Sequence, residues 1–283
     1  MPREGLVLGM PEDEYHGGPE FSSSAAKAIL ETPAHYKWEY IDGNRKHSKA
    51  FDVGTAVHSK VLGVGAAVVA YPEEILGANG AASTTAAKKF KAEQTAAGFI
   101  VMKQAEVDQI NLMAESALAH PLAGAILEHE AGHSEASLFA TDPETGLRLR
   151  CRFDRLLPGR GLSADVKTTP DVSRRAFATA IARYKYHVQR AHYLHVARLI
   201  GLDIADMVFI AVQNTAPYLT TTNTIDADFA AKGEELAVNA RRTLVHCLET
   251  NEWPGYSTGL ETLRLPGWAV YEYQDLEEQE LEG

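Results

Sequence analysis

The stretch LRLRCRFDRLLPGRGLSADVKT, residues 147–168, decides the fold of this chain, because two β-strands and the turn between them can be read from it. Apolar and polar residues alternate along 147–157, which puts Arg148, Arg150, Arg152 and Asp154 on one face of a strand and Leu147, Leu149, Cys151 and Phe153 on the other. We therefore expect a half-buried strand with one polar face. The PGRG at 158–161 is typical of a turn between antiparallel strands, and it predicts that residues 162–168 return beside the first strand.

The segments around this hairpin predict a mixed α/β core. A further strand at 134–140 precedes it, joined through the turn signal DPETG at 142–146, and two more strands are expected at 204–213 and 218–225. N-cap residues, prolines and helical periodicity predict helices at 22–31, 33–40, 51–62, 85–97, 103–119, 122–128, 171–183, 186–200 and 226–249. Helices, then a strand meander, then helices and strands again are typical of a central mixed sheet flanked by helices.

The length and composition are those of one large globular domain. The 283 residues are 45% hydrophobic and 23% charged, so we treat 1–283 as a single domain. Within it we expect a helical N-terminal part at 1–62, a mobile small-residue loop at 76–88, a core with the central strands at 130–225 and a frayed acidic tail at 272–283.

Several function classes are excluded by simple counts. The longest near-apolar stretch, 61–71, is far shorter than the roughly 20 residues of a membrane span, and the acidic N-terminus does not suit a signal peptide. We therefore expect a cytoplasmic protein with no membrane partner. Cys151 and Cys247 have no CxxC spacing, which leaves no disulfide framework and no four-thiolate metal site.

The charge is unevenly distributed along the chain. The net charge is −11, yet residues 148–190 hold eleven Lys or Arg against three Asp, a local net charge of +8. Such a basic segment within an acidic chain indicates a face that handles a polyanion such as DNA, although a solvated charged surface would give the same count. We expect Arg152, Arg174 and Arg175 of this segment to contact DNA.

Asp154 and the triplet Asp165-Val166-Lys167 carry the chemistry. Residues 165 and 167 share one strand face, so two carboxylates and an amine are predicted to lie on the same side of neighbouring strands. Two carboxylates this close repel each other unless a cation lies between them, and hard oxygen ligands suit Mg²⁺ or Mn²⁺. Lys167 would then orient water or stabilise charge on a phosphoryl oxygen. Taken alone, the DxK pattern also fits an ordinary ladder of surface charges.

With these motifs the chain resembles the PD(D/E)xK nucleases, and within them the RecE-like exonucleases of phages and prophages (exodeoxyribonuclease VIII type). The resemblance lies in the order of the segments SSSAAKAILETPAHYKW, FDVGTAVHSKVL, SEASLF, CRFDRLL, ADVKTT and QRAHYLHVA. It implies a restriction-endonuclease-like core. Phe153, rather than proline, precedes the first metal-binding acid.

The resemblance also implies roles for individual residues. His58 resembles the family's helix-borne active-site histidine, and Glu135 the acid on the first core strand. The metal ligands it implies are Asp154, Asp165, the carbonyl of Val166 and His58, with Lys167 as the catalytic lysine. Gln189 and Tyr193 match the QxxxY motif, whose spacing of four places both side chains on one helix face, where they could hold DNA or order the site. From the residues alone, His58 also fits a core histidine and Glu135 a surface acid.

The activity implied is that of a Mg²⁺-dependent exodeoxyribonuclease, with Mn²⁺ as substitute, that degrades linear double-stranded DNA 5′ to 3′. No GxxxxGK[ST] motif is present, which agrees with an ATP-independent enzyme. The resemblance further implies a homo-oligomeric ring and a RecT-like single-strand annealing protein as partner in recombination. Two alternatives remain: a nuclease of this fold with another polarity or a single-stranded substrate, and a non-catalytic DNA-end-binding protein.

Overall fold

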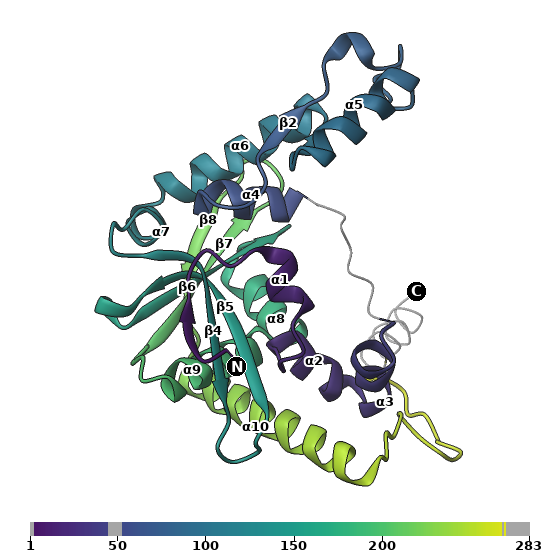
Figure 1. Cartoon of the computed structure of the whole chain (residues 1–283), viewed down its shortest axis with the longest axis vertical. Helices are drawn as coiled ribbons and strands as arrows, with labels where there is room; N and C mark the ends of the chain where they lie inside the picture. The colour runs from purple at the N-terminus through teal and green to yellow at the C-terminus, as the bar shows by residue number, and fades with distance from the viewer. Residues whose placement is uncertain (1–2, 45–52, 268, 270–283) are drawn as a thin grey trace, which may run out of the picture.

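The architecture is a six-stranded mixed sheet between two layers of helices (Figure 1). A computed structural model describes residues 3–44, 53–267 and 269; the acidic tail expected at 272–283 and the first two residues of the helix expected at 51–62 lie outside this range. The sheet order is β1-β4-β5-β6-β7-β8, with bounds Gly5–Val7, His133–Thr141, Arg148–Leu157, Leu162–Thr169, Asp206–Gln213 and Thr220–Asn223. Strands β6 and β7 are parallel and all other neighbours are antiparallel, which confirms the predicted mixed sheet.

The crossover between the parallel strands β6 and β7 is made by α8 (Arg174–Arg183) and α9 (Tyr186–Leu199). These helices, with α2 (Ser23–Glu31) and α10 (Ala227–Thr250), pack on one face of the sheet around Phe153, Phe177 and Phe209. The other face is covered by α4 (Val53–Leu62), α6 (Gln104–Ala119) and α7 (Pro121–Leu127). The two cores fix both faces of β5 and β6, the strands that carry the acids.

The N-terminal part is helical, as expected, but it also contributes to the sheet. Ser22 caps α2 and Thr32 caps α3 (Pro33–Tyr36), which runs into a π-helical turn, η1 (Lys37–Ile41). The sequence patterns missed β1 and the short helix α1 (Glu12–Gly17). Because β1 pairs with β4, it brings the preceding and following residues over the polar face of β5.

The expectation that β5 would be half exposed is wrong. Both of its faces are covered, and Arg150 is 2% exposed and Arg152 8% exposed. The guanidinium of Arg150 donates to the carbonyl oxygens of Tyr15 and Gly18, so the N-terminal segment satisfies charges that the alternation pattern assigns to solvent. An alternating pattern reports which residues share a face, and a covering segment can bury either face.

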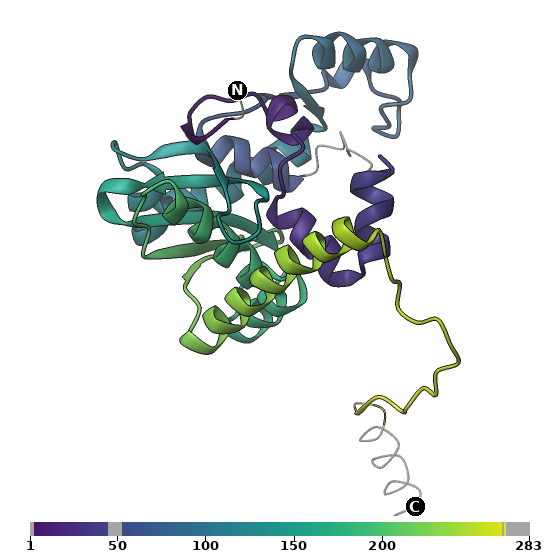
Figure 2. The same cartoon turned by 60° about the horizontal axis from the view of Figure 1, so that its bottom comes forward.

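A small extension beside the main body holds β2 (Val68–Ala70), β3 (Ile100–Met102) and α5 (Thr85–Ala96), which Figure 2 shows apart from the central sheet. The loop expected at 76–88 contains a turn in which Gly77 N–H donates to the carbonyl of Ala81, and its last residues belong to α5, capped by Thr84. The mobility of this loop stays a prediction. No single helix in the described ranges has the length and apolar composition of a membrane span; the bent pair of α6 and α7, with 96° between its parts, meets that requirement when taken together.

Candidate active site

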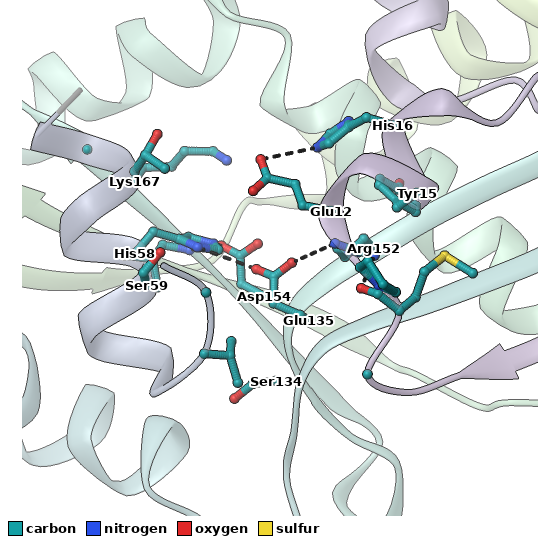
Figure 3. A pocket seen from close by; sticks show the side chains of 18 of the residues that line it. Glu12, Tyr15, His16, His58, Ser59, Ser134, Glu135, Arg152, Asp154 and Lys167 are labelled. Carbon is teal, nitrogen blue, oxygen red and sulfur yellow. Dashed lines mark hydrogen bonds and ion pairs between the residues drawn. The ribbon is translucent and has the colours of Figure 1, made fainter. Parts of the chain in front are cut away.

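A pocket of about 740 Å³ lies where α1, α4 and the strands β4, β5 and β6 converge (Figure 3). The pairing of β5 with β6 is continuous from Leu157 and Leu162 to Arg155 and Ala164, and it stops there. Asp154 and Asp165 are the next residue on each strand, so both acids lie where the two strands begin to separate. This opening provides the space in which side chains of both strands face one cavity.

Glu135 is the most unusual backbone position of the site. Strand β4 pairs with β5 through Ser134 and Arg155 on one side and through Ala136 and Phe153 on the other, but Glu135 between them has φ of 52°. Left-handed backbone at a non-glycine residue inside a strand is uncommon and costs of the order of 1–3 kcal/mol. Such strain is retained most often at functional sites, and here the distorted residue is the acid that faces Asp154 and His58.

His58 of α4 joins the two acids. Its Nδ1 lies 3.4 Å from Oε1 of Glu135 and its Nε2 lies 2.9 Å from Oδ2 of Asp154. Burial lowers the pKa of His58, but the charge and hydrogen bond of Asp154, together with Glu135, outweigh it and raise the pKa to about 9. In this structure the imidazolium therefore supplies the positive charge that the two carboxylates require.

Asp154 is held in place by the neighbouring strand. Its Oδ2 accepts a hydrogen bond of 2.7 Å from the N–H of Val166, which replaces the strand pairing lost where β5 and β6 separate. Burial raises the pKa of Asp154, but His58, Lys167 and this N–H reverse the effect and lower the pKa below its ordinary value. Glu135 shows the opposite shift, because burial and the charge of Asp154 raise its pKa. Asp154 is thus the acid that remains ionised most readily.

Lys167, which lines the cavity, forms a second pair with the buried Asp165. Nζ of Lys167 lies 2.6 Å from Oδ2 of Asp165, and Nε2 of Gln189 donates to Oδ1 of the same carboxylate over 2.6 Å. Burial lowers the pKa of Lys167, but Asp165 and Asp154 dominate and raise the pKa above its usual value. The ammonium group is therefore charged, and it lies 4.9 Å from the ring centroid of Tyr186.

The donor set fits a divalent cation. His58, Glu135 and Asp154 each offer a ligand atom, and these three atoms lie within 4.8 Å of one another. Oδ2 of Asp165 is buried beside this cluster, and its partner there is the ammonium of Lys167 at 2.6 Å. Glu135, expected only as a catalytic acid, belongs to the three-residue cluster, whereas Asp165 is engaged with Lys167 and Gln189. The N–H of Val166 is used by Asp154, and a ligand role for the Val166 carbonyl stays a prediction.

The residues expected to contact DNA lie in different places. Gln189 is buried and holds Asp165, and Tyr193, on the same face of α9, lines the pocket and packs its ring edge against Phe153. Arg152 lines the pocket too, but its guanidinium donates to Ser137, Glu135 and the carbonyl of Met10. Arg174 and Arg175 are exposed at the start of α8, outside this pocket.

The basic segment at 148–190 is only partly a surface. Several of its basic side chains contact other parts of the chain instead of solvent. Arg148 and Arg150 contact the N-terminal part, Arg155 donates to carbonyls near α7, and Arg190 pairs with Asp206. The exposed arginines in this segment are Arg160, Arg174, Arg175 and Arg183, and three of these four lie on α8. The charge count alone therefore overstates the basic surface.

Sequence reasoning missed the residues that close the pocket from the N-terminal side. Met10, Glu12, Tyr15 and His16, from α1 and the residue pair before it, line the cavity opposite α4 (Figure 3). Nε2 of His16 lies 3.9 Å from Oε1 of Glu12, and the guanidinium of Arg152 lies over the ring of Tyr15 at 4.2 Å. No motif marks these residues, because they reach the site only when β1 pairs with β4.

A mixed sheet whose central strands carry Asp154 and the Asp165-Val166-Lys167 triplet, beside a helix-borne histidine, defines a PDDEXK-like nuclease fold. The chain belongs to the family described as a PDDEXK-like domain of unknown function (DUF3799), which matches residues 22–266. This membership confirms the superfamily that the motif order indicates.

Comparison with solved structures supports the same fold. A candidate exonuclease from Eubacterium rectale superposes with a TM-score of 0.59 at 12% identity, covering 92% of this chain and 96% of that one. A phage-related exonuclease from Haemophilus somnus 129PT is also 12% identical, with a TM-score of 0.37 and coverage of 82% of this chain and 96% of that one. No curated protein matches the sequence significantly.

Proposed function

We propose that this protein is a Mg²⁺-dependent exodeoxyribonuclease that degrades linear double-stranded DNA 5′ to 3′ and leaves 3′ single-stranded tails. The observation that carries the proposal is the cluster of His58, Glu135 and Asp154, with ligand atoms within 4.8 Å of one another beside the Lys167–Asp165 pair. A protein that only binds DNA has no chemical need for three converging ligands and a charged lysine in one cavity.

The residues of the cavity have separable roles in phosphodiester hydrolysis. Asp154, Glu135 and His58 would hold the cation, with Asp165 next to them, and His58 would release a ring proton to solvent so that its nitrogen could coordinate. A bound divalent cation would supply Lewis-acid stabilisation of phosphoryl oxygen and a more acidic water. The ammonium of Lys167 would stabilise the negative charge that builds on the phosphoryl oxygens, because it is charged and its side chain is only 21% exposed. Gln189 orients Asp165, and Arg152 orients Glu135.

The finer parts of the proposal rest on the resemblance to RecE-like exonucleases. They are the 5′ to 3′ polarity, a homo-oligomeric ring around the DNA, a RecT-like annealing partner in recombination and a cytoplasmic site of action. The acidic net charge of −11 favours a ring of this kind, because DNA would be attracted only where basic residues such as Arg174 and Arg175 are exposed.

The test is digestion of linear duplex DNA labelled at either the 5′ or the 3′ end, with Mg²⁺, with Mn²⁺ and with EDTA. We expect wild type to release the 5′ label first, EDTA to abolish release, and Lys167→Ala to lower the rate by at least about a hundredfold. Lys232→Ala is the matched control, because Lys232 is an exposed lysine on α10 that pairs only with Glu235 among the described residues.

Each alternative has its own outcome. Release of the 3′ label first would replace the proposed polarity, and cleavage of single-stranded DNA alone would replace the duplex substrate. Duplex DNA that is bound equally with and without EDTA, and never cut, would identify a DNA-end-binding protein and overturn the proposal.

A further inference from the structure

A second cavity, of about 300 Å³, adjoins the first along Lys167, Thr168 and Tyr186, which line both. Its other walls come from α8 and from the residues after β6, with Phe177 at its buried end and Arg183 and Tyr184 at the junction of α8 and α9. This volume is at the lower end of small-molecule sites and suits a single nucleotide. Lys167 is the one residue lining this cavity that has an active-site role assigned above.

The aromatic residues of the second cavity form a stack that ends at the surface. The ring of Tyr186 stacks on Phe209 of the core with centroids 6.1 Å apart, and the ring of Tyr184 lies against Tyr186 at 5.7 Å and 30°. Lys185 between the two tyrosines has φ of 53°, so the chain turns sharply there and two rings two residues apart face each other. Tyr184 is 52% exposed, which leaves part of its ring available to a ligand.

The charges around the stack favour an anionic aromatic ligand. Nζ of Lys167 and Nζ of Lys27 lie 4.9 and 5.2 Å from the ring centroid of Tyr186, and the guanidinium of Arg183 lies 5.7 Å from that of Tyr184. Asp171, the acid that lines this cavity, already accepts the N–H of Ser173. A nucleotide complements this surface, because its flat base can stack on an exposed ring and its negatively charged phosphate can lie beside the cations.

We propose that this second cavity is a nucleotide subsite, in which the base next to the scissile phosphate of the cleaved strand stacks on Tyr184. The inference rests on the proposed nuclease function and names where that function holds its substrate. Lys167 belongs to both cavities, so a nucleotide in the second one places its neighbouring phosphate beside the catalytic ammonium. Stacking is insensitive to base identity, as an enzyme that degrades any sequence requires.

The test uses duplexes that carry 2-aminopurine at the first or second nucleotide of the 5′-ended strand, mixed with protein in EDTA so that the DNA is not cut. Fluorescence anisotropy measures binding, and quenching of 2-aminopurine reports stacking of the base on a ring. We expect quenching with wild type and with Tyr184→Phe, and its loss with Tyr184→Ala together with roughly 5- to 100-fold weaker binding.

The control variant is Leu122→Ala, because Leu122 is also 52% exposed but lies on α7 and lines neither cavity. If Tyr184→Ala binds the duplex and quenches 2-aminopurine as well as Leu122→Ala does, the proposed subsite is overturned. Cleavage of the same duplexes by wild type with Mg²⁺ is measured in parallel. If wild type cuts the DNA but Tyr184→Ala leaves the quenching unchanged, only the subsite is contradicted. If wild type never cuts the DNA, the proposed function is contradicted.

Discussion

The structure distinguishes the two roles that the QxxxY motif allows for Gln189, contact with DNA and ordering of the active site. Its spacing from Tyr193 fits either a DNA contact or a part in ordering the active site. The structure shows its amide donating to Oδ1 of Asp165 over 2.6 Å, and Gln189 is 6% exposed. A buried amide with its donor committed to a carboxylate positions that carboxylate, because little of its surface is accessible to a DNA strand.

Gln189→Ala is therefore expected to lower kcat roughly 10- to 100-fold while leaving KM for DNA unchanged. The measurement is steady-state digestion of end-labelled duplex, compared with Gln109→Ala, whose amide donates to the carbonyl of Asn214 away from the cavity. A raised KM with unchanged kcat would show instead that Gln189 contacts DNA.

His192 is expected to make the protein sensitive to acid. It is fully buried on α9, where one ring nitrogen lies 2.9 Å from the carbonyl oxygen of Arg150, and burial lowers its pKa to about 4. Between about pH 6.5 and 4 the unfolded chain takes up a proton that the folded chain does not. The free energy of unfolding should therefore fall as pH drops through this window, by about 3 kcal/mol in total, and be fully present above it.

The measurement is urea unfolding at pH 4 to 7, with the ring titration of His192 followed by NMR. His192→Gln keeps a hydrogen-bonding side chain but has no proton to gain, so its stability should depend less on pH over this range. An imidazole that titrates near its ordinary pKa in the folded protein would contradict the prediction.

The buried side chain of Asp142 connects the hairpin between β4 and β5 to the layer of helices α9 and α10. Asp142, 1% exposed, pairs with Arg241 of α10 at 3.1 Å and with His195 of α9 at 3.3 Å. Arg241 is itself 3% exposed, so its charge depends on Asp142 for compensation. Two residues later Glu144 pairs with Arg242, the next residue of α10, but both of these side chains are more than half exposed.

The buried pair Asp142–Arg241 and the exposed pair Glu144–Arg242 allow the effect of burial to be measured at neighbouring positions. Asp142→Ala should lower the free energy of unfolding by about 3–5 kcal/mol, because it leaves a buried guanidinium without its partner. Glu144→Ala should change it by less than about 1 kcal/mol, because solvent screens an exposed pair. Chemical denaturation measures both, and equal effects of the two substitutions would show that burial does not distinguish them.

Metal binding should be visible as a gain in the stability of the folded chain as a whole. The cluster of His58, Glu135 and Asp154 draws on α4, β4 and β5, so it exists only in the folded state. A cation at 100 times its Kd stabilises such a state by about 2.7 kcal/mol. We expect Mg²⁺ or Mn²⁺ to raise the Tm by about 5 °C over EDTA, and Asp154→Asn to remove this shift.

Glu144→Gln serves as the control for that experiment, because Glu144 is an exposed acid outside the cluster. A metal-induced shift that persists in Asp154→Asn, or is absent from wild type at millimolar metal, would contradict the assignment of these ligands.

The order of strands and helices along the chain was readable from local patterns. The segments at 134–140, 147–157 and 162–168 became β4, β5 and β6 with bounds shifted by at most one residue, because alternation and turn residues act over a few positions. The pairing of Asp165 with Lys167 on one strand face follows from the same two-residue period. His58, by contrast, could be assigned only through the family resemblance, since a single histidine on an apolar helix has no pattern of its own.

Three features could not be read from local patterns, and the first of them depended on a contact between distant segments. The pairing of β1 with β4 brought Met10 and Tyr15 to the pocket and buried Arg150 and Arg152, so the charged face of β5 became internal. The left-handed φ of Glu135 and the separation of β5 from β6 beyond Arg155 are backbone features that no residue pattern at these positions predicts. Local periodicity determines which side chains share a face, whereas what covers that face is decided by residues more than a hundred positions away, and no local pattern encodes that distance.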